Sequence, residues 1–169
     1  MTDRPPLPFD PIAEARRQWH AHGWDGAAPA MAVVTSIMRV QQILLARADA
    51  ALRAHDLTFA RYEVLMLLSF ARRHELPLGT IGHRLQVNPA SVTNAVDRLE
   101  QQGLVERVPN PADGRGTLAR LTDEGGRVAL EATGVMNAEV FKDLGVAAAD
   151  LEQLFDLLCG VRRAAGDFD

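Results

Sequence analysis

The chain has one cysteine, few aromatic residues and almost no lysine. Cys159 is the single cysteine among 169 residues, which excludes an internal disulfide framework and a zinc site made from several cysteines of one chain. It stands in the apolar run LFDLLCGV, so we expect a buried thiol that serves packing rather than redox chemistry. Of the 18 basic residues 17 are arginines, whose planar guanidinium suits phosphate and guanine.

Long apolar stretches are also absent. No uninterrupted apolar run reaches the roughly 18 to 20 residues that a membrane span needs, and the segment MTDRPPLPFD lacks the basic and apolar blocks of a signal peptide. The sequence therefore predicts a cytoplasmic protein without a membrane partner. Hydrophobic residues make up 47% and charged residues 24%, which are ordinary values for one globular domain with additional helices.

The charge of the chain is unevenly distributed. The formal net charge is −4, which argues against coating nucleic acid by bulk positive charge. Residues 1–76 and 77–121 each carry a net charge of +1, whereas residues 122–169 carry −6. The acidic excess therefore lies at the C-terminal end of the chain.

The pattern of apolar residues predicts a mainly α fold with a small β-wing. Four prolines in residues 1–11 mark the start of an N-terminal arm, residues 1–30, which includes a short helix ending near Gly23. Helical periods follow in 31–54 and 122–169, and both carry more apolar surface than one small lobe can cover, so we expect dimerisation helices. Residues 55–121 remain as a separate lobe between these helices.

A helix-turn-helix is predicted in the middle of this lobe. A short helix over 78–85 is followed by Asn88-Pro89, an N-cap and first-turn pair that starts a second helix. The second helix buries a stripe of Val92, Val96 and Leu99 and ends at Gly103. Two strand-like runs, LVERVP and TLARL, then flank the turn-rich segment NPADGRG and predict a wing.

The outward face of the second helix is the candidate DNA-reading surface, because such a helix enters the major groove by its N-terminal turns. The residues on this face or at its edge are Ala90, Ser91, Thr93, Asn94 and Arg98. Asn94 can pair with adenine, Ala90 can touch a thymine methyl, and Arg98 can reach phosphate or guanine. Asp97 on the same side repels phosphate unless an arginine pairs with it. Taken alone, the face also fits an ordinary solvated helix.

The wing tip adds a second candidate contact. Arg115 stands between two glycines, so it can approach a narrow groove without bulky neighbours, and Asp113 can hold it in place. An ordinary surface turn would use Asp113-Gly114 equally well. The order of helix, helix, strand, loop with arginine and strand favours DNA binding.

The stretches LTFARYEVLMLL and LPLGTIGHRLQVNPASVTNAVDRLEQQGLVERVPNPADGRGTLARLTDEG resemble the MarR family of bacterial transcription regulators. The resemblance covers about residues 31–163. It implies a winged helix-turn-helix homodimer that binds pseudo-palindromic operator DNA, most often as a repressor. The family's wing arginine and its supporting aspartate correspond to Arg115 and Asp113. Ala147 and Ala148 depart from the family, because many relatives have a Ser or Thr helix cap there.

A small-molecule effector site is predicted where the first long helix and the next helix meet the lobe. Met38, Phe59, Tyr62, Met66 and Phe70 supply apolar and aromatic surface there. Arg39 and Arg61 can hold a carboxylate, and Trp19 can close as a lid. Core packing explains most of these residues equally well. Urate-responsive relatives use an N-terminal tryptophan and an acidic residue, for which this chain has Glu63.

Other chemistry has less support. His20 and His22 point to different sides of a helix and predict no metal site, and we expect no cofactor. The alternatives to a regulator are a small helical enzyme or ligand-binding protein that uses an interhelical pocket, with Ser69 or a histidine as the reactive group, and a helical scaffold. No nucleophile, metal or phosphate-loop motif supports an enzyme.

Overall fold

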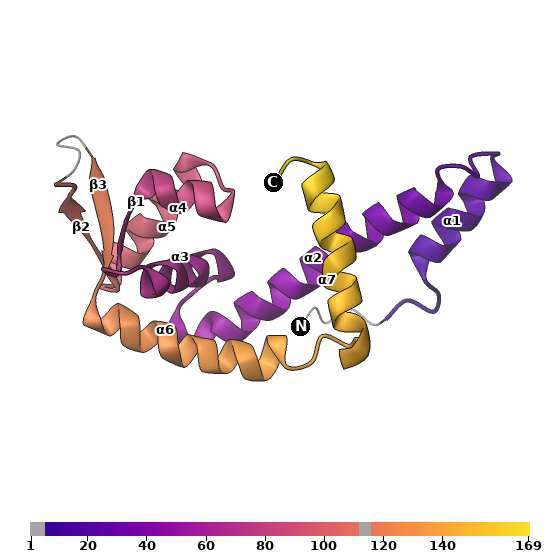
Figure 1. The fold of residues 1–169 in the computed structure, drawn as a ribbon. Coiled ribbons are helices and arrows are strands. Elements are labelled where there is room, and N and C mark those ends of the chain that lie inside the picture. The colour runs from indigo at the N-terminus through magenta and orange to yellow at the C-terminus, as the bar shows by residue number, and fades with distance from the viewer. Residues whose placement is uncertain (1–5, 112–115) are drawn as a thin grey trace.

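A computed structural model describes residues 6–111 and 116–169 and shows a mainly helical chain with a small sheet at one end (Figure 1). The α-helices are α1 (Pro11–Ala21), α2 (Ala28–Leu52), α3 (Phe59–Phe70), α4 (Leu78–Leu85), α5 (Pro89–Gln101), α6 (Asp123–Met136) and α7 (Ala148–Ala164). A 3-10 turn, η1 (Arg53–His55), follows α2, and a π-helical turn, η2 (Asn137–Phe141), follows α6. The strands are β1 (Glu75–Pro77), β2 (Val105–Pro109) and β3 (Thr117–Leu121).

The starts of α5 and α6 and the end of α5 lie where the sequence predicts them, whereas α2 begins at Ala28, inside the predicted arm 1–30. The side chain of Asn88 accepts a hydrogen bond from Ser91 N at 2.9 Å and starts α5, and Thr122 does the same for α6 through Gly125 N at 2.9 Å. Gly103 follows α5 with a positive φ of 71°, which a glycine adopts without strain. Ala147 gives α7 no side-chain cap, as expected from its methyl group.

The wing sheet has a third strand that the sequence analysis missed. Its order is β1-β3-β2 and both pairings are antiparallel. β1 spans three residues and ends in Pro77, so it is too short to show an alternating pattern and looks like a break between helices. It forms because β3 offers a free edge, where Leu121 N donates to His74 O at 2.8 Å.

The core of the molecule lies where α3, α5 and α6 meet beneath the sheet. Leu65 and Leu68 of α3 are fully buried there. The predicted stripe of α5, Val92, Val96 and Leu99, is buried against them and is confirmed. Together with α4, these three helices and the sheet form the winged lobe, residues 55–111 and 116–136. The lobe thus includes α6, the first helix of the C-terminal segment.

The middle of α2 and all of α7 pack little within the chain, whereas the first turns of α2 pack against α1. Figure 1 shows α2 extending from the winged lobe to α1 at the opposite end of the molecule. Many of its apolar side chains are exposed, for example Val34 at 50%. None of the residues of α7, all of which the structure describes, is buried. Cys159 on α7 is only half-buried, so the prediction of a buried packing thiol is wrong for a single chain.

Segment Ala28–His55 is, by length and composition alone, apolar enough to cross a membrane. Its mean hydropathy reaches 1.3 over 18 residues, although polar residues interrupt every long apolar run. A core or interface helix of a globular protein has the same composition. Here the last turns of α2 pack into the winged lobe through Ala48, Ala51 and Leu52, which links the helix to that lobe.

Candidate nucleic-acid interface

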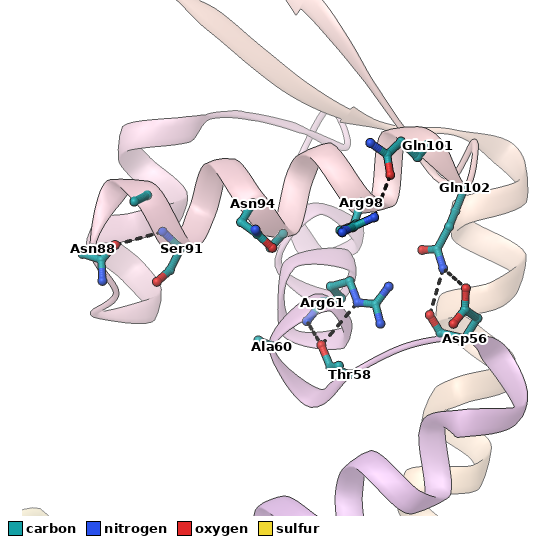
Figure 2. Close-up of a pocket in the computed structure, with 12 residues that line it drawn as sticks. Asp56, Thr58, Ala60, Arg61, Asn88, Ser91, Asn94, Arg98, Gln101 and Gln102 are labelled. Atoms are coloured by element: carbon teal, nitrogen blue, oxygen red, sulfur yellow. Dashed lines mark hydrogen bonds between the residues drawn. The ribbon is translucent and has the colours of Figure 1, made fainter.

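A groove of about 890 Å³ lies between α5 and the start of α3 (Figure 2). The α5 wall contains four of the residues predicted to read DNA, Ala90, Ser91, Asn94 and Arg98. The opposite wall comes from the segment 56–61. The predicted face of α5 therefore borders a groove, which the sequence did not predict.

Hydrogen bonds fix the two walls relative to each other. At the end of α5, Gln102 Nε2 donates to the backbone oxygen and to the carboxylate of Asp56, both at 2.8 Å. At the start of α3, Phe59 N donates to Asp49 Oδ1 on α2 at 2.7 Å. The width of the groove is thus set by contacts that join α2, α3 and α5.

Two arginines enter the groove from opposite walls, as Figure 2 shows. Arg98 on α5 donates to Gln101 Oε1 at 3.2 Å, and Arg61 on α3 donates through Nε to Thr58 Oγ1 at 3.3 Å. The N-terminus of α3 adds the positive end of its dipole, while Phe59 N and Arg61 N already donate to Asp49 and Thr58. The groove is therefore suited to an anion such as a backbone phosphate.

Arg61 lies here rather than with the other residues of the predicted effector site. Its place in the first turn of α3, three residues after the cap Thr58, is readable from the sequence. The sequence does not show that this turn lies beside α5, because the two segments are far apart along the chain and meet only in the folded structure.

Thr93 is on a different side of α5 from the groove. It lines a smaller cavity of about 380 Å³ between α4 and α5, together with Gly79 and His83. Its hydroxyl donates to Pro89 O at 3.0 Å within the helix. The structure thus separates Thr93 from the four residues that share the groove wall.

Asp97 is paired with an arginine, the condition under which it does not repel phosphate. Arg107 Nη2 on β2 lies 2.6 Å from Asp97 Oδ1, and Arg107 also forms an ion pair with Glu100. Burial acts to lower the pKa of Arg107, but the hydrogen bonds from Glu100 and Asp97 outweigh it and hold this pKa above its usual range. The guanidinium therefore stays charged between two carboxylates of α5.

The outer face of the sheet has a second arginine between two acids. Arg120 on β3 lies opposite Glu75 on one neighbouring strand and Glu106 on the other. Its Nε is 2.8 Å from Glu75 Oε2, and its Nη1 is 3.4 Å from Glu106 Oε1. These cross-strand pairs hold the three strands together. The predicted wing contacts Asp113 and Arg115 lie outside the described residues.

Part of the predicted effector site is core packing between α3 and α6. Tyr62 is buried, and its hydroxyl lies 3.1 Å from Thr133 Oγ1. Met66 Sδ is 3.1 Å from the same Thr133 oxygen, and the ring of Phe59 packs 6.2 Å from that of Tyr62. Within one chain these three side chains stabilise the winged lobe.

The remaining predicted effector residues are spread along the molecule. Met38 and Phe70 are exposed, and Arg39 contacts only Gln42, at 3.4 Å, among the hydrogen bonds of the described residues. Trp19 on α1 packs edge-on against Trp24 at a centroid distance of 5.3 Å. Because α1 lies at the far end of α2 from α3 (Figure 1), Trp19 does not reach Tyr62 in the same chain.

Glu63 on α3 is half-buried in this region. Burial raises the pKa of its carboxyl group, because removing the charged form from water is unfavourable.

The two histidines of the arm have protein partners. His20 on α1 pairs with Asp25 at 2.6 Å, and His22 lies 2.7 Å from Gln18 O. Within the described residues no group of three potential metal ligands gathers.

The order of α4, α5, β2 and β3, with an anion-attracting groove beside α5, defines a winged helix-turn-helix protein of the DNA-binding class. Residues 55–116 match the model of the MarR family. The structure of Sco5413, a MarR family transcriptional regulator from Streptomyces coelicolor, is 50% identical, with a TM-score of 0.77 over 83% of this chain and 98% of that one. The chain belongs to the MarR family of transcriptional regulators.

Two further solved structures are of relatives with a bound molecule. A mutant of MarR from Escherichia coli in complex with operator DNA is 27% identical, with a TM-score of 0.72 over 81% of this chain and 98% of that one. CouR from Rhodococcus jostii RHA1 bound to p-coumaroyl-CoA is 25% identical, with a TM-score of 0.67 over 76% of this chain and 90% of that one.

Proposed function

We propose that this chain is a homodimeric repressor whose helix α5 reads operator DNA and which a small apolar or aromatic anion releases. The observation that carries the proposal is the α5 wall of the groove, where Ala90, Ser91, Asn94 and Arg98 share one exposed surface. The operator complex of the E. coli relative supports this assignment. The relatives named above are regulators, and no observation on the described residues favours the enzyme alternative. A cytoplasmic location follows from DNA binding.

Asn94 is the residue proposed to select a base. Its amide can pair with an adenine edge through two hydrogen bonds, an interaction that discriminates by about 1 to 3 kcal/mol. Duplex fragments bound by the protein are first selected from the source genome. Asn94→Ala should then weaken binding to the selected fragment by that amount and relax the preference at one base pair in each half-site.

The control for this substitution is Gln18→Ala, which removes an exposed amide side chain from α1, outside the helix-turn-helix and the proposed dimer segments. It should leave both affinity and sequence preference unchanged. Equal losses by Asn94→Ala on the selected and on random fragments would reassign Asn94 to the phosphates. Failure of the wild-type protein to bind any duplex would refute the proposed function.

Arg61 and Arg98 are proposed to contact the phosphates of one strand along the groove. A phosphate contact adds affinity on every sequence, and each one contributes about one unit to the dependence of log affinity on log salt concentration. Arg61→Ala should therefore weaken binding to selected and random duplexes alike and reduce the salt slope by about one for each protomer. The control is Arg16→Ala on α1, at the other end of the molecule.

The wing is proposed to contact DNA through Arg115, with Asp113 as its support. If Arg115 senses the potential of a narrow minor groove, Arg115→Ala weakens binding to both kinds of duplex. An unchanged affinity and salt slope would show that the wing tip makes no contact with DNA.

The dimer is proposed to form through 31–54 and 122–169, with 1–30 as an arm and 55–121 as the DNA-binding lobe. The exposed apolar side chains of α2 and α7 together are called the dimer face: Val33, Val34, Ile37, Met38, Val40, Ile43, Leu45, Leu151, Phe155, Leu157, Leu158 and Val161. A patch of this kind marks an interaction surface. Two α5 helices would then lie about 34 Å apart, and sedimentation of a folded monomer at micromolar concentration would refute the dimer.

The effector site is proposed to be completed by the second protomer, near Met38, Arg39, Phe59, Tyr62, Met66 and Phe70, with Trp19 as a lid. One chain does not bring these residues together, and the CouR complex with p-coumaroyl-CoA supports a ligand with an aromatic part and negative charge. To release DNA a hundredfold, the ligand must distinguish two dimer shapes by about 2.7 kcal/mol. Titration of p-coumarate with and without operator should give different affinities. Equal affinities would show that this molecule is not the inducer.

A further inference from the structure

Two carboxylates of α5 lie beside the surface proposed to read DNA. Asp97 comes three residues after Asn94, and Glu100 comes three residues after Asp97, so both follow the same side of the helix. About half of the Asp97 side chain and two-fifths of the Glu100 side chain are exposed. Like charges a few ångström apart repel each other, and they do so more strongly near a protein surface than in bulk water. Unpaired carboxylates here would oppose the approach of phosphate.

Arg107 is placed to prevent this. It lies opposite Ala119 of β3, which is fully buried, so its side chain leaves the sheet on the face that packs against α5. Its Nη2 lies 2.6 Å from Asp97 Oδ1, and its Nη1 forms an ion pair with Glu100 Oε2. The backbone N–H of Arg107 also donates to Glu100 Oε1 at 3.1 Å. Both carboxylates are therefore held against β2.

The geometry differs from that of a phosphate-binding arginine. Only 25% of the Arg107 side chain is exposed, and its donors are occupied by two acids. Arg98 on α5 is exposed, and its guanidinium donates to the neutral amide of Gln101 rather than to an acid. Arg98 is thus available to meet DNA, whereas Arg107 is committed to the protein.

We propose that Arg107 is a positioning residue of the DNA interface, which holds Asp97 and Glu100 away from the phosphates and neutralises them. The inference rests on the proposed function of α5. Strand β2 would thus neutralise the negative charge of the recognition helix, which the base-reading residues do not do.

The test is a set of three variants that share one fold: Arg107→Gln, the pair Asp97→Asn with Glu100→Gln, and the triple variant. Affinities are measured on the selected genomic fragment and on a random duplex of the same length. Arg107→Gln should weaken binding to both duplexes about tenfold, because it uncovers both carboxylates. The pair of amide substitutions should bind at least as tightly as the wild type. When Asp97 and Glu100 are already replaced by amides, Arg107→Gln should change the affinity for DNA by less than about threefold.

Each other result would overturn the inference. A tenfold loss from Arg107→Gln in both backgrounds would mean that Arg107 contacts a phosphate itself. Weaker binding by the pair of amide substitutions would mean that the ion pairs only brace the lobe. Thermal unfolding of each variant confirms that the lobe is folded. If the wild type binds DNA and Arg107→Gln binds it equally well, this inference alone is refuted. If the wild type binds no duplex, this inference is refuted together with the proposed function.

Discussion

The winged lobe and the dimer face use apolar residues in opposite ways. In the lobe, side chains such as Leu65 and Leu99 are fully buried by other parts of the same chain. On the dimer face, Phe155 remains 58% exposed although it follows the helical pattern equally well. The lobe therefore encloses its own core, whereas the dimer face needs a surface that one chain does not supply.

The strongest test of the lobe is Gly125→Ala in the first turn of α6. An added Cβ would lie 2.0 Å from the backbone oxygen of Leu104, and a backbone atom has little room to move. We expect the free energy of unfolding to fall by about 3 kcal/mol or more, measured by urea denaturation. The control is Gly126→Ala, where the nearest atom is 3.9 Å away. There the better helix propensity of alanine should be neutral or stabilising by up to about 1 kcal/mol.

The matching test of the dimer face is the double variant Val34→Glu with Ile37→Glu. These neighbours on one side of α2 are both exposed in a single chain. Two charges in an apolar interface should raise the dimer dissociation constant at least about a hundredfold, which is about 2.7 kcal/mol, seen by sedimentation velocity. The far-ultraviolet circular dichroism signal, which reports the helices of the lobe, should persist. Val87→Glu, at an exposed apolar side chain of the winged lobe outside 31–54 and 122–169, is the control.

Tyr62→Phe tests a polar contact inside the lobe. Thr133 donates its hydroxyl hydrogen to Ala129 O at 2.7 Å, so the Tyr62 hydroxyl donates to Thr133 Oγ1. Loss of this bond should reduce the free energy of unfolding by about 1 kcal/mol. Thr133→Val should remove the same interaction, and the double variant should then lose less than the sum of the two. Additive losses would show that the two hydroxyls do not interact.

Glu63→Gln should change how stability depends on pH. Burial raises the folded-state pKa of Glu63 above its ordinary value, so folding favours the protonated form. Its unfavourable contribution is therefore absent at low pH and develops as the pH rises from about the ordinary value of 4.5 through the raised folded-state pKa. The variant should unfold at a higher temperature than the wild type at about pH 7 and at the same temperature near about pH 3. Glu139→Gln on the exposed turn η2 should show no such difference.

The residues that end helices were the most predictable part of the chain. Thr58, Asn88 and Thr122 cap helices through their own side chains, and Gly103 ends α5 with a positive φ. Each of these is a local interaction between neighbours in the sequence, so the residue type is enough to predict it. The buried stripe of α5 was predictable for the same reason, because its spacing follows one turn of a helix.

Contacts between distant segments were not predictable in this way. β1 forms only because β3 lies beside it, and Arg61 reaches the α5 groove only because α3 crosses that helix. The predicted effector residues are spread over the α3–α6 core, the α5 groove, α2 and α1, because packing of separate elements and the length of α2 set the distances between them.

The sequence by itself determined the capping residues of α3, α5 and α6, the outward face of α5 and membership of the MarR family. These depend on residue types and on spacing along the chain. Tertiary structure alone decided that Arg61 and Arg98 share one groove and that Arg107 pairs with Asp97 and Glu100. The physical reason is that an ion pair or a groove depends on distances of a few ångström, and packing of separate elements sets those distances.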